Sequence, residues 1–401
     1  MRTTWSFHNA GQLLFGQGAA DQLGDCARQA GARRVLIVTD RPLVDAGVVE
    51  QVRAPLAGAD IDVGVYDGGK PEPPVTLVDE VVAAASTFHP DVLLGLGGGS
   101  NMDVAKAAAV VLAHGGNAVD YAGDQVVPGP VFPLILVPTT AGTGSEVTAA
   151  AVLADPERGS KFGILSNYLR PGVAVVDPLL TVSCPPRVTA GSGIDTLTHA
   201  VEAYTAIDNE EFPLPQGEQT VYQGRHPLGD LLAQQAIELV GLHLRAAVAD
   251  GNQLDAREGM ALAATLAGMS FSNVGVAAVH ALEYALNKLA HTPHGAGCGL
   301  LLPFVMQFNA PARPRQMRRI AQWLGQDVSA LDDESATRCA VTAVENLKKD
   351  IGIPARLADV GVRMEQLPEM ARTAFSVKRI LRVNPRPVTL EDMQAILESA
   401  F

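Results

Sequence analysis

The stretch LLGLGGGSNMDVAKAAAVVL, residues 93–112, combines an apolar run, a cluster of glycines and a long run of small and apolar residues. The first part is typical of a buried β-strand and the last part of an α-helix, so the glycines fall in the turn between them. The turn residues are Gly97, Gly98, Gly99 and Ser100. Glycines let backbone N–H groups approach a phosphate, and a helix start adds partial positive charge. The turn fits a pyrophosphate site, although a plain strand-to-helix connection has the same composition.

Apolar runs of this kind recur along the first half of the chain. They cover residues 34–40, 61–68, 91–100, 132–140 and 172–178, and helical patterns cover residues 74–88 and 101–113. Such alternation predicts a mostly parallel sheet covered by helices. From about residue 188 only helical segments follow, interrupted by residues 213–227, which we expect to form an exposed loop. We therefore predict an α/β domain, residues 1–183, and an all-helical domain, residues 184–401.

Composition limits the classes of function. The 401 residues carry a net charge of -13, which leaves no basic excess to neutralise nucleic acid or an anionic membrane surface. The four cysteines are scattered without a C-x-x-C pair, which argues against disulfides and against a thiolate zinc site. The chain has no signal-peptide pattern and no run of 18 apolar residues. We expect a cytoplasmic enzyme with no nucleic-acid or membrane partner.

A second polar turn, PTTAGTGSEVT at residues 138–148, follows another predicted strand. Turns at the carboxyl ends of parallel strands line one crevice, where open α/β sheets bind ligands. Asp40 ends the first predicted strand, a position where a carboxylate commonly accepts hydrogen bonds from an adenosine ribose. It would repel a 2'-phosphate and so favour NAD over NADP. An N-cap of the following helix explains Asp40 equally well.

The segment GSGIDTLTHAVEAY, residues 191–204, places Asp195 and His199 four residues apart on one face of a predicted helix. An acidic first turn and a buried core histidine would explain this pair alone. Three more histidines lie close together in residues 279–297, namely His280, His291 and His294. A carboxylate with three imidazoles suits Fe(II) or Zn(II), without cysteine. The pattern therefore favours a metal site, and it does not decide between His291 and His294.

Four motifs in this order are similar to those of the iron-containing, or group III, alcohol dehydrogenases. They are GGGSNMDVAK (97–106), PTTAGTGSE (138–146), GIDTLTHAVEAY (193–204) and VHALEYALNKLAHTPHG (279–295). The resemblance extends from residue 15 to residue 309. It implies a dehydroquinate synthase-like architecture, with a dinucleotide-binding α/β domain and a helical metal- and substrate-binding domain. It also implies a homodimer or a higher homo-oligomer.

The resemblance assigns roles to particular residues. The implied metal ligands are Asp195, His199, His280 and His294, and the implied cofactors are NAD and Fe(II) or Zn(II). The implied nucleotide-binding residues are Gly97, Gly98, Gly99 and Ser100 at the pyrophosphate, Thr139, Thr140 and Thr143 along the adenosine and nicotinamide path, Asp40 at the ribose and Lys161 near the nicotinamide.

Two positions depart from the family pattern. Asn101 stands where many members have proline, and we expect the turn to keep its shape. Tyr284 stands where many members have a histidine beside the substrate or in a proton path. Tyr284 is therefore our candidate catalytic residue, as a hydrogen-bond donor in place of that histidine.

The resemblance implies a metal-dependent, NAD-linked dehydrogenase that interconverts a small alcohol and its aldehyde or ketone. One alternative is a metal-independent reductase of the maleylacetate reductase type, but those typically lack the acidic ligand that Asp195 provides. Another is a hydroxyacid dehydrogenase of the same superfamily. A lyase like dehydroquinate synthase and a non-enzymatic assembly protein fit the four motifs less well.

Overall fold

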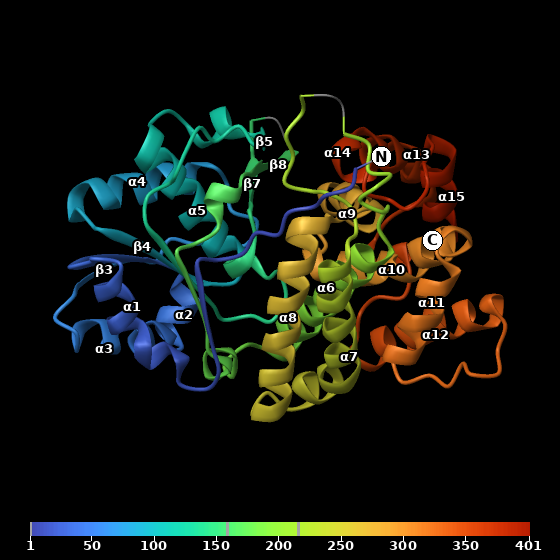
Figure 1. Ribbon diagram of the computed structural model, residues 1–401, viewed down its shortest axis with the longest axis horizontal. Helices are drawn as coiled ribbons and strands as arrows, with labels where there is room; N and C mark the ends of the chain where they lie inside the picture. The colour runs from blue at the N-terminus through green and yellow to red at the C-terminus, as the bar shows by residue number, and fades with distance from the viewer. Residues whose placement is uncertain (1, 158–159, 215–216) are drawn as a thin grey trace. The chain divides into compact units, whose positions relative to one another are not determined.

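The computed structural model describes residues 2–157, 160–214 and 217–401. The chain divides into two compact units, which are described separately (Figure 1). The α/β unit consists of His8–Cys184 and Gln219–Val221. The helical unit consists of the N-terminal residues up to Phe7, Pro185–Glu218 and Tyr222–Phe401. The inclusion of the N-terminal segment in the helical unit is a feature that the sequence pattern did not indicate.

The α/β unit is built on a parallel sheet with the strand order β1-β9-β6-β4-β2-β3. The strands are β1 (Gln12–Phe15), β2 (Arg34–Val38), β3 (Asp62–Tyr66), β4 (Val92–Gly97), β6 (Leu134–Pro138) and β9 (Val173–Val176). Its helices are α1 (Leu23–Gln29), α2 (Arg41–Asp45), α3 (Val48–Ala57), α4 (Thr76–Phe88) and α5 (Gly99–His114). All five predicted strands and both predicted helices are present, and the predicted α/β class is confirmed.

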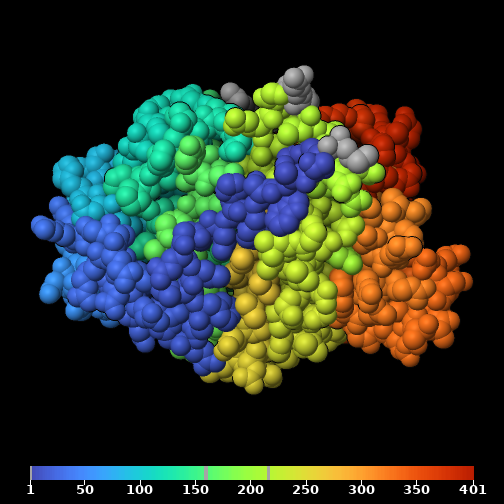
Figure 2. Space-filling view, viewed as in Figure 1, coloured from blue at the N-terminus to red at the C-terminus, as the bar shows by residue number. Residues whose placement is uncertain are grey.

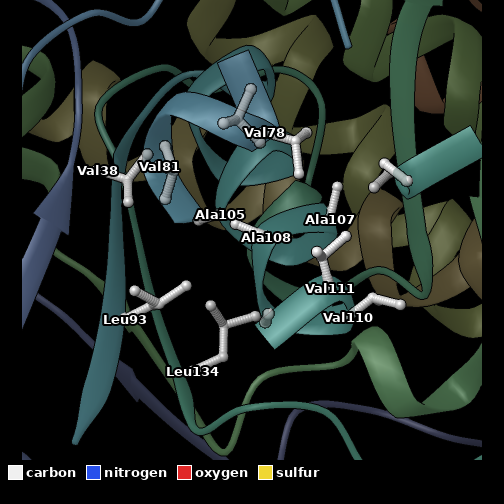
Figure 3. Close-up of a cluster of buried hydrophobic side chains, with 14 of the residues drawn as sticks. Val38, Val78, Val81, Leu93, Ala105, Ala107, Ala108, Val110, Val111 and Leu134 are labelled. Atoms are coloured by element: carbon white, nitrogen blue, oxygen red, sulfur yellow. The ribbon is translucent and has the colours of Figure 1, made fainter. Parts of the chain in front are cut away.

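Successive residues of the central strands face opposite sides of the sheet, and both sides are covered. Leu93 belongs to a core cluster with α4 and α5, whereas Leu94 belongs to a cluster with α1 and α3. Figure 3 shows the first cluster, with Val38, Leu93 and Leu134 of the sheet, Val78 and Val81 of α4, and Ala105, Ala107, Ala108, Val110 and Val111 of α5. Burial on both faces explains why these strands are continuous apolar runs.

A smaller sheet lies in the same unit and was not predicted. It consists of β5 (Gly123–Asp124), β7 (Ala150–Asp155) and β8 (Ser160–Leu165), in the order β5-β8-β7. β7 and β8 pair antiparallel, and β5 pairs with β8 in parallel. β7 packs on α5 and so extends the core beyond the main sheet.

The helical unit contains no β-strand among its described residues, as predicted. Its longer helices are α6 (Pro186–Thr205), α7 (Pro227–Ala249), α8 (Leu254–Val274), α9 (Ala278–Ala290), α10 (His294–Asn309), α11 (Pro314–Trp323), α12 (Asp333–Asp350), α13 (Leu367–Ser376) and α15 (Leu390–Ala400), with the short α14 (Lys378–Leu381). Helices α6, α7 and α8 pack against one another, and α10 packs on α6 and α9. Three of these helices, α6, α9 and α10, carry the candidate metal ligands.

The prediction of an exposed loop over residues 213–227 is wrong in its second half; residues 215–216 lie outside the described part. Tyr222, Gln223 and His226 are buried. The backbone N–H groups of Gln223 and Gly224 donate to the last residues of α8, so this segment has partners inside the unit. Figure 2 shows the blue N-terminal segment lying across the yellow-green part of the helical unit. Trp5 of that segment stacks on His226, with 4.4 Å between the ring centroids.

Among the described residues, no single helix is both long and apolar enough to cross a membrane. The pair α8 and α9 passes that test of length and composition only when taken together, and the two helices are bent by 103° at the break between them.

Candidate metal centre and nucleotide turn

Helix α6 places Asp195 and His199 side by side in the helical unit. The helix begins at Pro186, and the two side chains lie four residues apart on one face. Both are buried, with exposed fractions of 2% and 5%. Gly193 allows α7 to pack closely, because a Cβ at this position would lie 2.2 Å from the side chain of Leu244. The acid and the imidazole therefore lie in a closely packed interior.

Helices α9 and α10 contribute further histidines. His280 lies in the first turn of α9, and His294 is the first residue of α10. Helix α9 ends at Ala290, and the next residue, His291, caps it with a left-handed backbone, at a φ of 51°. At Gly295 a Cβ would lie 2.1 Å from the carbonyl oxygen of Gly191 in α6. This glycine lets α10 begin against α6 and thereby brings His294 to the acid.

The donor atoms converge on Asp195. Its Oδ1 lies 3.8 Å from Nε2 of His280 and 3.9 Å from Nε2 of His294. These separations are too long for hydrogen bonds. Two ligands bound about 2.1 Å from one tetrahedral cation lie about 3.4 Å apart. The observed spacing is therefore close to that of ligands around a shared cation.

Each of these two imidazoles contacts a carboxylate through its Nδ1 atom. Nδ1 of His280 lies 2.6 Å from Oε2 of Glu202. The same Oε2 accepts a hydrogen bond from the backbone N–H of Ala277, and Oε1 accepts one from that of Val279. Nδ1 of His294 lies 2.5 Å from Oε2 of Glu283. A carboxylate only accepts, so both Nδ1 atoms carry the proton and both Nε2 atoms keep a lone pair toward Asp195. This is the arrangement that orients imidazoles toward a metal.

The cluster has polar atoms that no protein group satisfies. Oδ1 of Asp195 and Nε2 of His280 are buried and have no hydrogen-bond partner. Burial alone would raise the pKa of Asp195, but the positive charge that the imidazoles of His199, His294 and His280 carry when protonated outweighs it and lowers the pKa below its ordinary value. An ionised oxygen and an imidazole lone pair, both buried and facing each other, fit a divalent cation between them.

The predicted ligands differ in how closely they converge. Among the described residues, one donor atom each from Asp195, His280, His294 and Cys298 lies within 4.8 Å of the others, and His199 is not in this set. The His199 ring stacks on the His280 ring at 4.7 Å, with its Nδ1 3.9 Å from Oδ2 of Asp195. Cys298, which the sequence analysis left out of the ligand set, lies one helical turn after His294 and close to the donor atoms of the cluster.

Tyr284 lies one turn after His280 on α9, and its ring is 6.4 Å from the His294 ring. Burial raises the pKa of the Tyr284 phenol well above its ordinary value. The phenol therefore stays protonated at neutral pH. It can donate a hydrogen bond, and it cannot act as a general base there.

The glycine turn joins β4 to α5 in the α/β unit. Gly97 has a φ of +141°, Gly98 is the N-cap and α5 begins at Gly99. The first N–H groups of α5, including that of Ser100, point away from the helix body, as in an anion site. A Cβ at Gly99 would lie 2.8 Å from Thr143, so the second predicted turn packs directly on the first.

The predicted threonines of the second turn lie beside the glycines. The backbone N–H of Thr139 donates to the carbonyl of Gly97 at 3.0 Å. A Cβ at Gly98 would meet the side chain of Thr140 at 3.5 Å. The structure therefore brings the two turns together at the carboxyl ends of β4 and β6.

Asp40 is connected to the glycine turn through Asn101. Its Oδ1 accepts a hydrogen bond from the backbone N–H of Leu43 and caps α2. Its Oδ2 accepts from Nδ2 of Asn101 at 2.7 Å, and the same amide donates to the carbonyl of Leu96. A Cβ at Gly97 would lie 2.3 Å from Nδ2 of Asn101, so the amide fills the space under the turn. Asn101 therefore ties the end of β2 to the end of β4.

Lys106, on α5, makes hydrogen bonds to the second turn, residues 138–148, and to the start of β7. It is fully buried, and its ammonium donates to Oγ of Ser145, Oγ1 of Thr148 and the carbonyl of Ala150. Burial lowers the pKa of Lys106 to about 8, although Asp103 opposes this shift. Lys161 lies on β8 with its ammonium 3.3 Å from Oε1 of Glu72.

Several residues of these sites were missed by the sequence reasoning. They are Glu202, Glu283, Cys298 and Lys106. Spacing was an available signal for three of them. Glu202 follows His199 by three residues, Glu283 follows His280 by three, and Cys298 follows His294 by four, so each shares a helix face with a predicted ligand.

Comparisons with known proteins agree with this architecture. The profile of "Iron-containing alcohol dehydrogenase" matches residues 10–178, and that of "Fe-containing alcohol dehydrogenase family, C-terminal" matches residues 217–401. Long-chain-alcohol dehydrogenase 1 of Geobacillus thermodenitrificans is 40% identical over 96% of this chain and 94% of its own. NAD-dependent methanol dehydrogenase of Bacillus methanolicus is 36% identical over 97% of each chain. The crystal structure of a 1,3-propanediol oxidoreductase superposes with a TM-score of 0.93, at 36% identity, over 99% of this chain and 100% of its own.

A parallel α/β unit with a glycine turn and a helical unit with a buried Asp and His cluster define an oxidoreductase that interconverts alcohols and aldehydes. The family matches together span most of the chain. The chain belongs to the iron-containing alcohol dehydrogenase family.

Proposed function

We propose that this chain catalyses the reversible, NAD-linked interconversion of a small alcohol and its aldehyde or ketone. The cation, Fe(II) or Zn(II), would be held by Asp195, His199, His280 and His294. The observation that carries the proposal is the convergence of two imidazole lone pairs on one buried carboxylate oxygen. Relatives named for the oxidation of long-chain alcohols and methanol support the reaction class.

The residues of the helical unit would prepare the site before substrate binds. Glu202 and Glu283 hold their histidines in the tautomer that presents Nε2. Asp195 supplies a fixed negative charge, so the complex with a divalent cation keeps a net positive charge next to the substrate oxygen. When bound, a divalent cation supplies the positive charge that stabilises negative charge developing on that oxygen.

Tyr284 would orient the substrate by donating a hydrogen bond to its oxygen. The raised pKa of the phenol supports this role, because the donor stays protonated across the neutral range. In this proposal the tyrosine is a donor and a positioning group and does not replace the proton acceptor of a histidine relay.

The α/β unit would bind NAD, which supplies the hydride acceptor or donor. The N–H groups at Gly97, Gly98, Gly99 and Ser100 would hold the pyrophosphate, with Thr139, Thr140, Thr143 and Lys161 along the rest of the nucleotide. Asp40 would accept hydrogen bonds from the adenosine ribose and repel a 2'-phosphate. The name of the NAD-dependent methanol dehydrogenase supports this choice of cofactor.

The test is hydride transfer measured as NADH absorbance. Protein stripped with a chelator is reloaded anaerobically with Fe(II) or Zn(II) and assayed with short primary alcohols, diols and hydroxy acids. We expect metal-dependent turnover that is lost together with bound metal in Asp195→Ala and His280→Ala. His291→Ala is the matched control, because it removes an exposed imidazole from the same helix junction outside the cluster. Full turnover without metal would overturn the proposal.

The assembly and location remain predictions. A homodimer or a higher homo-oligomer in the cytoplasm would fit the family, and sedimentation of the purified protein measures the first of these. Small alcohol or aldehyde substrates are the expected partners.

A further inference from the structure

Asn101, one of the two departures from the family pattern, is buried near the start of α5, with an exposed fraction of 2%. Its Nδ2 donates two hydrogen bonds, to Oδ2 of Asp40 at 2.7 Å and to the carbonyl of Leu96 at 3.1 Å. Within the described ranges, 2–157, 160–214 and 217–401, it is the one side chain that hydrogen-bonds to Asp40. Both N–H groups of the amide are thus engaged, and one of them holds the carboxylate.

The carboxylate of Asp40 is half-buried and is held at both oxygens. Oδ1 accepts from the backbone N–H of Leu43 at 3.0 Å, and Oδ2 accepts from Asn101. Arg41, the next residue along the chain, pairs with other acids. Each carboxylate oxygen can accept two hydrogen bonds, so each keeps one lone pair for a ligand. The two contacts fix one rotamer of a side chain that otherwise has several.

The amide of Asn101 is itself held by two glycines. A Cβ at Gly97 would lie 2.3 Å from its Nδ2, and a Cβ at Gly69 would lie 2.2 Å from its Oδ1. Gly69 follows β3 in sequence, and its backbone N–H donates to the carbonyl of Thr39 at 3.0 Å. The amide therefore fills a space between the ends of β2, β3 and β4 and cannot turn away without a shift of the backbone. The donor is in place before a ligand binds.

A carboxylate at this position can distinguish nucleotides in two ways. Its negative charge repels a 2'-phosphate, and this repulsion depends on distance far more than on the rotamer. Accepting a hydrogen bond from a 2'-hydroxyl depends on orientation, because misaligned hydrogen bonds are weak. A carboxylate that turns freely must also be ordered when the ligand binds, and the ordering lowers affinity. The contact with Asn101 orders Asp40 in advance.

We propose that Asn101 is a positioning residue that directs the carboxylate of Asp40 at the 2'-hydroxyl of the adenosine ribose. The inference rests on the proposed function in one respect, namely that the adenosine half of NAD binds at the end of β2 beside the glycine turn. Asn101 touches no ligand and acts through Asp40. It sets how strongly the chain prefers a ribose with a 2'-hydroxyl over one without it, whereas the charge of Asp40 sets the rejection of a 2'-phosphate.

The experiment measures nucleotide binding to the purified protein through the fluorescence of bound NADH. ADP and 2'-deoxy-ADP are titrated against bound NADH, and NADPH is titrated directly. In the wild type we expect ADP to bind about tenfold more tightly than 2'-deoxy-ADP, the effect of one hydrogen bond to a charged acceptor. In Asn101→Ala this ratio should fall toward one. NADPH should still bind more weakly than NADH there, because the charge of Asp40 remains.

Further variants separate positioning from a merely structural role. Asp40→Ala should abolish both preferences, and adding Asn101→Ala to it should change the ratio of ADP to 2'-deoxy-ADP affinity no further. Thr181→Val is the matched control, because it removes a buried hydrogen bond of the same unit, from Oγ1 to the carbonyl of Pro178. It should keep the wild-type ratio. A distorted glycine turn would weaken ADP and 2'-deoxy-ADP alike and leave their ratio unchanged.

The outcomes distinguish the inference from the proposed function. An unchanged ratio in Asn101→Ala, a further fall in the double variant, or equal binding of ADP and 2'-deoxy-ADP by the wild type would overturn the inference and leave the NAD site in place. Absence of NADH binding to the wild type would overturn both. If Asn101→Ala does not fold, a crystal structure of the wild type with ADP answers the question. Asp40 bonded to Asn101 and to the 2'-hydroxyl together supports the inference, and Asp40 turned away from Asn101 refutes it.

Discussion

Replacing Glu202 by glutamine tests whether the carboxylate behind His280 prepares the metal site. Oε2 of Glu202 accepts from the Nδ1–H of His280 and from the N–H of Ala277, and Oε1 accepts from the N–H of Val279 at 2.7 Å. A glutamine has one carbonyl oxygen. Placed at the Oε2 position it keeps two of these bonds, but its NH₂ group then faces the N–H of Val279. The variant therefore weakens the imidazole contact and leaves buried donors unsatisfied.

The expected magnitude follows from these contacts. A carboxylate behind a metal-bound imidazole contributes about 10–100-fold in metal affinity, or about 1.4–2.8 kcal/mol. Glu202→Gln keeps a neutral acceptor and should lie near the tenfold end, whereas Glu202→Ala removes the acceptor and should lie near the hundredfold end. The unsatisfied donors should also lower the free energy of unfolding by about 1–3 kcal/mol.

The assay is a competition titration of zinc against a chromophoric chelator, with urea denaturation of the metal-free protein alongside. Thr205→Val is the matched control on α6, because it removes the buried hydrogen bond from Oγ1 to the carbonyl of Val201 and touches no imidazole. It should cost about 1 kcal/mol of stability and leave metal affinity unchanged. Equal metal affinity in folded Glu202→Gln and the wild type would refute the reasoning.

Three further predictions concern packing, a buried lysine and a buried histidine. Gly295→Ala places a Cβ 2.1 Å from the Gly191 carbonyl oxygen and should abolish metal binding while circular dichroism still shows a helical protein; retained metal would contradict the packing argument. Lys106→Met removes three hydrogen bonds and should lower the free energy of unfolding by about 2 kcal/mol in urea at neutral pH, so unchanged stability would count against it. Burial lowers the pKa of His226 to about 4, so stability is complete above about pH 6.5 and declines as pH falls toward 4, by at most about 3 kcal/mol. His226→Asn keeps a helix cap and should flatten that decline in urea titrations at several pH values; a decline as steep as in the wild type would show that other groups cause it.

The sequence predicted five of the six strands of the main sheet, all except β1, because both faces of the sheet are buried. Strands such as β4 must then be apolar at every position, which makes them visible as continuous runs. Strands β7 and β8 were not predicted, for the opposite reason. β7 alternates buried and half-buried residues and contains three alanines, a residue type with low strand propensity. Its strand character comes from its partner and from α5, neither of which is local in sequence.

The metal site was only partly predictable for a related reason. Asp195 and His199 share a helix face, but their spacing indicated a site only together with the histidines of residues 279–297. Cys298 was set aside because the cysteines are scattered, but scattering argues only against sites made of several thiolates. A single thiol beside an imidazole leaves a different signal, the four-residue interval from His294 to Cys298. Whether Cys298 and His294 reach Asp195 depends on the contact of α10 with α6. That contact requires the close approach of Gly295 and Gly191, which spacing along the sequence does not show.

The buried charges explain why this site needs a cation. Asp195, Glu202 and Glu283 have exposed fractions of 2%, 3% and 0%. Within the part of the chain that the structure describes, all of their ion-pair partners are histidines, and no lysine or arginine pairs with them. Burying carboxylates without compensating charge is costly, so the metal-free protein must either keep protons on its imidazoles or lose stability. A divalent cation supplies the missing charge where the neutral imidazoles direct their lone pairs. Metal binding and folding of the helical unit are therefore coupled, and a cation present at 100 times its dissociation constant should add about 2.7 kcal/mol to the free energy of unfolding.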